Sequence, residues 1–503
     1  MVEPASGSAP SGAVPDRPPT GGHDRPVRRS LSTGRVVFLV IAAAAPLAAM
    51  VGNVPLALLD GNGVGLPAAY LVALIVLLCF SVGYAAMSRR VVNTGAFYTY
   101  IARALGKPAG IAAAYVAVVS YAGLTCGLIG AFGYFTRLVL LDLGVDIPWY
   151  VFSALAIAII ALLGYRSADL SAKVLGKLMV GEFAVLIVFD LLVIGEHGRD
   201  AFPLESFSGA EVFSGSIGIA LMFAFTSFVG FESAALYGEE TKDPERSIPR
   251  ATYVAVTSIG VFYILTTWLI IGAAGGTAAP ALAGEQLGNF VFNLIEDAGG
   301  EVLYDLAAVL FCTSVLASAL ALHNAASRYV FALGREHVLP ARLGKTHPQH
   351  GSPYVASLWV TGLAVVSTVA MTVFQADPYT VFATSFIGLG TLGIIALQAA
   401  AALAVVVFFW RRPDRNIWRC VVAPTIGFIG LGAGFVLAIT HYSILTGSTN
   451  ILIDAVPAVL VVAAVAGVLA AIRLRRTQPA VYAEVAASQL RPRTAPTDRT
   501  TTE

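Results

Sequence analysis

Two carboxylic acids lie in apolar stretches of the sequence, where an ionised side chain is costly, and they have the clearest potential for chemistry. The first, Glu182, belongs to the run LMVGEFAVLIVF, which contains no basic residue that could neutralise it. Desolvation favours the protonated carboxyl, so Glu182 could bind and release a proton during a functional cycle. The alternative is a glutamic acid that stays protonated, bonds to a backbone carbonyl and holds helices together.

The second acid, Glu232, follows the apolar residues 217–229 and precedes a strongly charged segment. Gly230, two residues earlier, loosens a helix, and Thr226 and Ser227 add polar groups just before it. A carboxylate beside such a turn favours a functional hinge in the membrane.

Three further polar residues are interpreted as structural. His323 could relay protons near neutral pH, but a polar contact between helices is the favoured interpretation. Asp190 and Asp305 fall near the outer ends of their apolar runs, where we expect water to solvate them.

The composition assigns the chain to the membrane proteins. Of its 503 residues, 57% are hydrophobic and 12% are charged, whereas charged residues make up about 25% of a typical soluble domain. The four cysteines show no CxxC pattern and predict neither a disulfide framework nor a metal site. No HExxH, GxSxG or P-loop motif is present, so we expect no enzyme, no cofactor and no nucleic-acid partner.

Apolar runs of about 20 residues, the length that crosses about 30 Å of hydrocarbon, predict an all-α polytopic protein with twelve transmembrane helices. The third, eighth and tenth runs are long enough to tilt or to project from the bilayer. The predicted spans are 36–58, 66–87, 109–136, 148–164, 174–195, 214–237, 252–274, 303–332, 354–374, 379–409, 420–441 and 450–472.

The basic residues predict the orientation. All but two of the 31 lysines and arginines fall in the tails or in loops on one side of the twelve spans, and the exceptions are Arg137 and Arg199. Basic residues concentrate on the cytoplasmic side of membrane proteins. We therefore expect a multi-pass protein of the plasma (cell inner) membrane, with both termini in the cytoplasm.

Helix-breaking residues interrupt the first and sixth predicted spans. Pro46, Gly52 and Pro55 lie in the first, and Gly230 follows the run TSFV in the sixth. Free backbone groups are tolerated at membrane depth where they line a cavity, so paired interruptions indicate a binding site between the two spans. For either span alone, a simple proline kink is an equally good interpretation.

The spacing of the two breaks indicates the substrate. Spans one and six are five apart and run in opposite directions, as an inverted repeat of five plus five spans requires. The span-six helix half that ends at its break presents a negative end, and the span-one half that starts at its break presents a positive end. A zwitterion with adjacent ammonium and carboxylate groups matches both ends, so the predicted substrate is an amino acid or a related small amine.

Three motifs give the chain a family resemblance over nearly all of residues 35–475. They are TGAFYTYIARALGKPAG, FTSFVGFESAALYGEETKDPERSIPRA and NAASRYVFALGREHVLPARLGKTHPQHGSP. In this order they resemble the amino acid-polyamine-organocation (APC) superfamily of secondary transporters. The resemblance implies the leucine-transporter type of fold, a 5+5 inverted repeat plus two peripheral helices, and alternating access around a central site. The expected units are a disordered tail at 1–34, repeats at 35–199 and 200–411, peripheral helices at 412–475 and a second disordered tail at 476–503.

The resemblance also implies roles for particular residues. The substrate carboxylate would meet the unwound backbone near Ala45, Pro46, Leu47 and Ala48. The amine would meet carbonyls around Phe225, Thr226 and Ser227, and Gly230 and Glu232 would form the hinge. Two positions depart from the family pattern: the Pro46 region replaces a GxG-type break, and Glu182 stands where many relatives have a lysine thought to take the place of a sodium ion.

Charged residues near the predicted cytoplasmic surface are candidates for an inward gate. Arg103, Arg328 and Arg335 alternate with aromatic residues. They could pair with the acids of the charged segment after Glu232 and latch the gate, although anchoring to the cytoplasmic surface is the alternative. The acids are Glu239, Glu240 and Asp243.

The sequence thus predicts a secondary active transporter of amino acids or related amines, coupled to H⁺, with Na⁺ as the alternative ion. An exchanger of amino acids or polyamines is the first alternative, and a receptor that binds an amino acid without moving it is the second. The predicted partners are the substrate and the lipid bilayer, in a monomer or homodimer.

Overall fold

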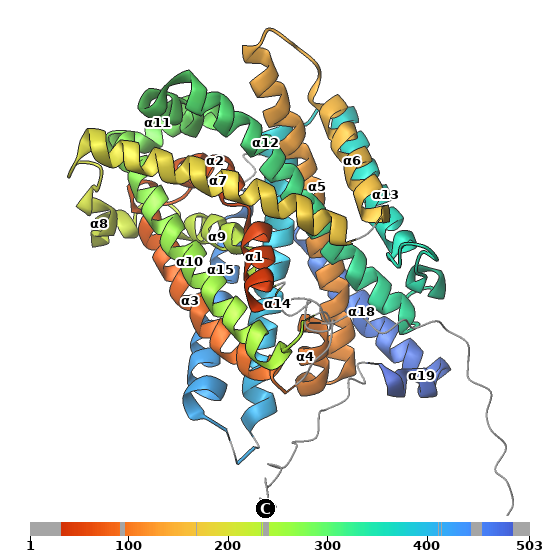
Figure 1. The fold of residues 1–503 in the computed structure, drawn as a ribbon. Coiled ribbons are helices and arrows are strands. Elements are labelled where there is room, and N and C mark those ends of the chain that lie inside the picture. The colour runs from red at the N-terminus through yellow and green to blue at the C-terminus, as the bar shows by residue number, and fades with distance from the viewer. Residues whose placement is uncertain are drawn as a thin grey trace, which may run out of the picture.

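A computed structural model describes residues 32–90, 96–166, 168–232, 234, 241–410, 412–413, 415–443 and 455–485 as a bundle of helices (Figure 1). The first half comprises α1 Thr33–Ala44, α2 Pro46–Asp60, α3 Leu66–Ser88, α4 Ala96–Leu105, α5 Lys107–Asp142, α6 Trp149–Arg166, α7 Ala168–His197, α8 Gly209–Val212 and α9 Ile217–Phe228. The second comprises α10 Pro244–Ala273, α11 Ala279–Gln286, α12 Phe290–Arg335, α13 Tyr354–Val373, α14 Thr384–Trp410, α15 Ala423–Thr440, α18 Ala458–Thr477 and α19 Pro479–Glu484.

The predicted all-α polytopic class is confirmed. Among the described residues, ten segments are long and apolar enough to cross a membrane. Two shorter apolar helices, α2 and α9, belong to the predicted spans one and six. The count of twelve and the predicted domain boundaries stay predictions.

The outer helices present large apolar side chains to their surroundings. Ile429 on α15, Val366 on α13 and Val461 on α18 are each more than 60% exposed. Such a surface is costly in water and suits the hydrocarbon of a bilayer.

The first span is divided at Ala45. The α1 helix ends at Ala44, Ala45 has a left-handed backbone with φ of 44°, and α2 starts at Pro46. Proline at the first helical position loses no intrahelical bond because that N–H has no partner in a helix. The predicted break is therefore present at Pro46, whereas Pro55 lies inside α2 and does not interrupt it.

The sixth span is divided at Gly230. The α9 helix ends at Phe228, and Gly230 has φ of 116°, in the region that favours glycine. Phe231, Glu232 and Ala234 continue the chain in a tight helical turn. The part of the predicted span after Ala234 lies outside the described residues.

The two broken spans occupy the interior of the bundle. The α1 helix packs against α7, α10 and α12, while α2 packs against α9 and α12 (Figure 1). The side of the bundle that carries α4 and the α14–α15 turn is here called the α4 end, and the opposite side is the α11 end. Both breaks lie between these ends, as a central site requires.

Candidate functional site

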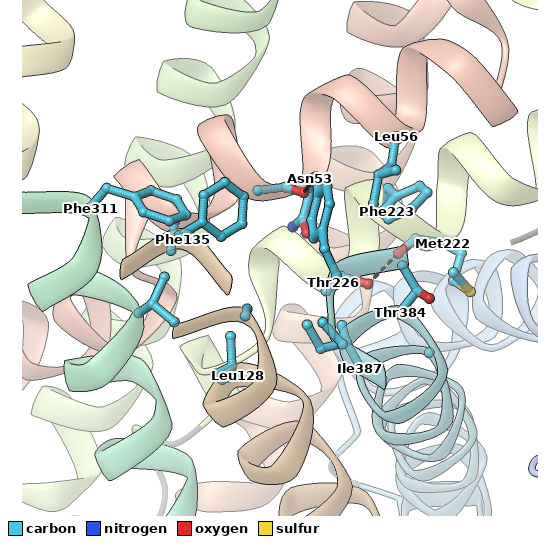
Figure 2. Close-up of a pocket in the computed structure, with 17 residues that line it drawn as sticks. Asn53, Leu56, Leu128, Phe135, Met222, Phe223, Thr226, Phe311, Thr384 and Ile387 are labelled. Carbon is cyan, nitrogen blue, oxygen red and sulfur yellow. Dashed lines mark hydrogen bonds between the residues drawn. The ribbon is translucent and has the colours of Figure 1, made fainter. Parts of the chain in front are cut away.

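A cavity of about 40 Å³ lies beside both helix breaks (Figure 2). Its walls come from α2, α5, α9, α12, α14 and the π-helical turn Pro378–Ala383 that leads into α14. Water needs roughly 10–15 Å³ of such space, so the cavity holds about three water molecules. None of the described residues that line it carries a charge.

The polar side chains around the cavity form hydrogen bonds with one another and with the backbone. Asn53 on α2 donates to Ser227 Oγ on α9 at 3.1 Å, and Ser227 donates in turn to the Phe223 carbonyl at 2.9 Å. On the α14 side, Thr226 lies 2.9 Å from the Thr391 hydroxyl. These bonds join the two broken spans to each other and to α14, which sets the width of the cavity.

Aromatic rings line the side of the cavity toward the α11 end. The Phe135 and Phe311 ring centroids lie 4.5 Å apart, and Tyr379 lies 5.1 Å from Phe135. Tyr379 also donates to the Gly52 carbonyl on α2 at 2.8 Å. These rings link α5, α12 and the turn before α14 to the second half of span one, and they separate the cavity from the α11 end.

Glu182 lies at the break of span one, away from the cavity walls. Its side chain is 3% exposed, and Ser314 Oγ on α12 donates to its carboxyl at 2.7 Å. The backbone N–H of Leu47, in the first turn of α2, donates to the same carboxyl. A helix N-terminus favours a negative charge, so this carboxyl connects α7, α12 and the start of α2 most strongly when it is ionised.

Glu232 lies at the break of span six and is 1% exposed. Tyr121 on α5 donates to its carboxyl at 2.9 Å, and the Gly230 N–H donates to the other oxygen at 3.1 Å. Tyr84 on α3 donates to the Glu232 carbonyl at 3.3 Å. The turn after Gly230 is thereby attached to α3 and α5, and its role as a hinge stays a prediction.

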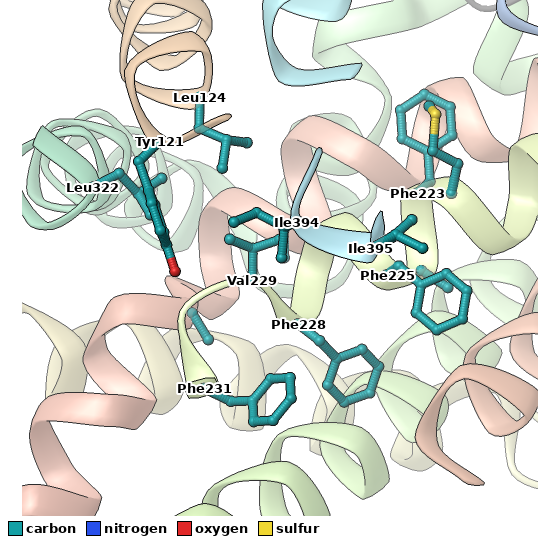
Figure 3. Packing of buried hydrophobic residues seen from close by; sticks show 14 of the residues in the cluster. Tyr121, Leu124, Phe223, Phe225, Phe228, Val229, Phe231, Leu322, Ile394 and Ile395 are labelled. Carbon is teal, nitrogen blue, oxygen red and sulfur yellow. The ribbon is translucent and has the colours of Figure 1, made fainter. Parts of the chain in front are cut away.

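Apolar side chains fill the space between this turn and the cavity. Figure 3 shows Leu124, Val229, Leu322 and Ile394 gathered beside Tyr121, whose hydroxyl points toward the turn after Val229. All are buried. The path from the cavity to the α4 end is closed in this structure.

The predicted substrate residues divide into three groups. Ala48 and Thr226 line the cavity. Ala45, Pro46 and Leu47 form the break that directly precedes Ala48. Ser227 does not line the cavity but accepts a hydrogen bond from the lining residue Asn53. The Phe225 ring, in contrast, packs against α15 beside Gly434.

Several lining residues were not among the predicted substrate residues: Gly52, which was predicted only as a helix-breaking residue, and Asn53, Phe135, Phe311 and Tyr379. Gly52 and Asn53 directly precede a Val-Pro pair in the interrupted part of span one, so the sequence contains a local signal for them. The rings of Phe135, Phe311 and Tyr379 come from three distant segments, and only the packing brings them together.

Only some residues of the predicted cytoplasmic gate are among the described residues. Glu239 and Glu240 lie outside the described residues, so their pairing with Arg103 or Arg328 stays a prediction. Asp243 is 4.0 Å from Arg246, one turn along the same helix, and both are exposed. This local pair differs from the predicted latch with a distant arginine.

The expectation for Asp190 is wrong. Asp190 was expected to be solvated, but it is 5% exposed on α7. Asp190 lies only one to two turns from the end of α7, so the sequence alone placed it near water. In the structure, α10 packs against α7 and excludes water from Asp190. Asp305 is exposed, as expected.

Comparison with known proteins agrees with this architecture. A family model described as "Amino acid permease" matches residues 31–484. The low-affinity putrescine importer PlaP of Escherichia coli (strain K12) is 26% identical over 425 residues, covering 81% of this chain and 88% of the relative. The branched-chain amino acid permease BcaP of Bacillus subtilis (strain 168) is 24% identical over 392 residues, covering 72% and 78% respectively.

Proposed function

Because the chain belongs to the amino acid permease family and is a membrane transporter, we propose that it takes up an uncharged amino acid together with a proton by alternating access. The observation that carries this proposal is the pair of broken spans, with an uncharged cavity on one side and the Glu182 carboxyl on the other. The α4 end, which carries most of the described basic residues of the loops, is the cytoplasmic side.

The helix ends beside the cavity suit a zwitterion. Ala48 lies in the first turn of α2, where backbone N–H groups present partial positive charge. Thr226 lies in the last turn of α9, where carbonyl groups present partial negative charge. An α-carboxylate therefore binds at α2 and an α-ammonium at α9.

The remaining walls select the side chain of the substrate. Leu56, Met222 and Val315 offer apolar contacts, and the described lining contains no carboxylate. The second ammonium of a diamine would lose its hydration here without gaining a counter-charge, which is strongly unfavourable. An amino acid with a small aliphatic side chain is thus the preferred substrate, even though one relative is a putrescine importer.

Glu182 couples proton binding to the movement of the two halves of span one, α1 and α2. The ionised carboxyl holds the start of α2 and Ser314 on α12 through charge-assisted hydrogen bonds. Protonation removes the charge and weakens both bonds, so α1 and α2 become free to move relative to α12. Substrate and proton then bias the same pair of helices.

Opening toward the cytoplasm requires the turn at Glu232 to move. The Tyr121 hydroxyl holds that turn, and the apolar side chains shown in Figure 3 fill the path behind it. Displacement of this turn opens the cavity to the α4 end and releases the substrate, as in hinge-type closure.

Uptake into proteoliposomes tests the proposal. Radiolabelled leucine, valine and alanine are expected to accumulate when the outside is more acidic, without Na⁺, whereas putrescine does not accumulate. Glu182→Gln should abolish this accumulation and retain exchange of internal for external substrate. Glu196→Gln, which neutralises an exposed acid on the same helix, is the matched control and should behave like the natural protein.

Three results would contradict the assignment. Unchanged pH dependence in Glu182→Gln removes Glu182 from coupling. A strict requirement for Na⁺ replaces the proton by sodium. Uptake that needs internal substrate and ignores the pH gradient supports an exchanger instead.

A further inference from the structure

Asp190 is a second buried carboxyl on α7, two helical turns from Glu182. The residues of α7 that face the bundle recur at helical spacing: Glu182, Val185, Leu186, Phe189, Asp190 and Val193. The eight-residue separation places the two acids on the same side of α7, about 12 Å apart along its axis. Asp190 is the one nearer the α11 end.

One oxygen of Asp190 has a protein partner. Thr266 Oγ1 on α10 donates to Oδ2 at 2.8 Å, while buried Oδ1 makes no hydrogen bond to any described residue. A buried ionised carboxylate with one donor is strongly destabilised unless a proton or a cation joins it. The free oxygen is therefore suited to bind a proton.

Three buried hydroxyls on α10, here called the hydroxyl face, lie between Asp190 and the break of span one. Thr266 and Thr267 follow Tyr263 by one turn, and all three are fully buried. Tyr263 donates to the Ala44 carbonyl at 3.1 Å, and Thr267 contacts the Met50 sulfur at 3.6 Å. Each hydroxyl has its own acceptor in this structure, and the Tyr263 bond reaches the backbone at the break of span one, where Glu182 also lies.

No described arginine or lysine on the helices packed against α7 forms an ion pair with Asp190. The described arginines of these helices are Arg35, Arg166, Arg246, Arg250, Arg328 and Arg335; Arg328 is half-buried and the others are exposed. On α7 itself, Lys177 is exposed and His197 lies two turns beyond Asp190. The acids toward the α11 end are Asp60, Glu296, Asp297, Glu301 and Asp305, and of the ionisable groups on α10, Tyr263 is the one within the buried hydroxyl face.

We propose that Asp190 loads the proton for Glu182 from the α11 side. A proton from water at that end binds Asp190 Oδ1 and passes toward Glu182 along the contact between α7 and α10. The α10 hydroxyls carry it after turning away from their present acceptors, each accepting one proton and releasing its own. It ends on the Glu182 carboxyl, and Asp190 returns to its ionised form. This proposal rests on the proposed proton-coupled uptake and adds the route by which the proton arrives.

The test measures leucine uptake into proteoliposomes against external pH. Asp190→Asn keeps the size of the side chain and an acceptor for Thr266 but cannot carry a proton. We expect its uptake at neutral external pH to fall about tenfold and to recover as the outside is acidified, with leucine exchange at equal pH within about twofold of the natural protein. Asp190→Glu should restore much of the pH profile.

A matched pair on α10 separates the relay from packing. Thr266→Val removes the hydroxyl at constant volume and should reduce uptake at neutral pH, whereas Thr266→Ser should retain it. Asp305→Asn, at an exposed acid toward the α11 end, is the control and should leave the profile unchanged.

The outcomes distinguish this proposal from the previous one. If Glu182→Gln keeps pH-dependent uptake, the coupling assignment itself fails. If Glu182→Gln loses it and Asp190→Asn keeps the natural profile, only the loading role of Asp190 is overturned. Should Asp190→Asn fail to fold, unchanged uptake at neutral pH in Thr266→Val overturns the role as well.

Discussion

Glu182 and Glu232 are both buried at a break in a membrane span, but their partners differ. Glu182 bonds to α12 and to the start of α2, so its charge connects three elements that are distant in sequence. Glu232 bonds to Tyr121 and to the N–H of Gly230 in its own turn. The first arrangement lets a proton change how helices are joined, whereas the second holds one turn closed. Similar chemistry at two breaks therefore fits the two proposed roles, coupling at span one and gating at span six.

The largest expected effect separates the two acids. Addition of leucine to proteoliposomes that contain a pH-sensitive dye should move protons with the substrate. Glu182→Gln is expected to reduce this proton movement to that of protein-free vesicles, because the coupling carboxyl is lost. Glu232→Gln should still move protons with whatever leucine it carries. If Glu232→Gln loses proton movement while its leucine flux is preserved, coupling belongs to Glu232 and its assignment to Glu182 is wrong.

Tyr121→Phe tests the gate with the next largest effect. The substitution keeps the ring stacked on Tyr329 and removes the hydroxyl that holds Glu232. A hydrogen bond to a charged group contributes about 1.5–3 kcal/mol, so the closed state should lose roughly tenfold or more in population. Labelling of a single cysteine introduced at Leu124 should become faster from the α4 end.

Tyr84→Phe provides the comparison for that measurement. Its bond to the neutral Glu232 carbonyl is longer, at 3.3 Å, and is expected to contribute only about 0.5–1.5 kcal/mol. Equal labelling rates in both variants would show that the carboxyl of Glu232 has no special part in closure.

Gly230→Ala tests the backbone of the same turn. With φ of 116°, an added side chain strains the chain by about 1–2 kcal/mol. We expect a lower melting temperature and slower uptake. Gly362→Ala on α13 is the matched control, because no atom lies within 4 Å of the added carbon and the backbone is helical. That variant should be stabilised by about 0.5–1 kcal/mol; a stable, active Gly230→Ala would exclude strain at the hinge.

The smallest expected effect lies between the two breaks. Asn53→Ala removes the bond from α2 to Ser227 on α9 and should weaken leucine binding by about 1 kcal/mol, roughly fivefold. The rise in melting temperature with added leucine measures it. Ser81→Ala, which removes a hydroxyl bonded within α3, is the control. Equal affinity in the natural protein and Asn53→Ala would show that this bond does not shape the cavity.

Much of the architecture was predictable because its signals are local in sequence. Apolar runs define membrane helices, and Pro46 and Gly230 mark where two of them break. The burial of Glu182 and Glu232 followed from charges placed within such runs. The identity of their partners did not, because Ser314 and Tyr121 belong to helices more than 100 residues away.

Asp190 shows why local signals were insufficient at the ends of spans. A carboxylate one to two turns from a helix end can reach water or be covered, and the sequence of α7 is the same in both cases. Packing of α10 decided the outcome and placed Thr266 on one of its oxygens. The same applies to the aromatic rings beside the cavity, whose segments meet only in the folded bundle.

The sequence by itself determined that this chain is a helical membrane protein with two broken spans and acids at membrane depth, since hydrophobicity and backbone freedom belong to each residue. Only the tertiary structure decided that the cavity is uncharged, that Glu182 faces the start of α2 and that Asp190 is buried. Those features depend on which helix faces cover one another, and contacts between distant segments set them.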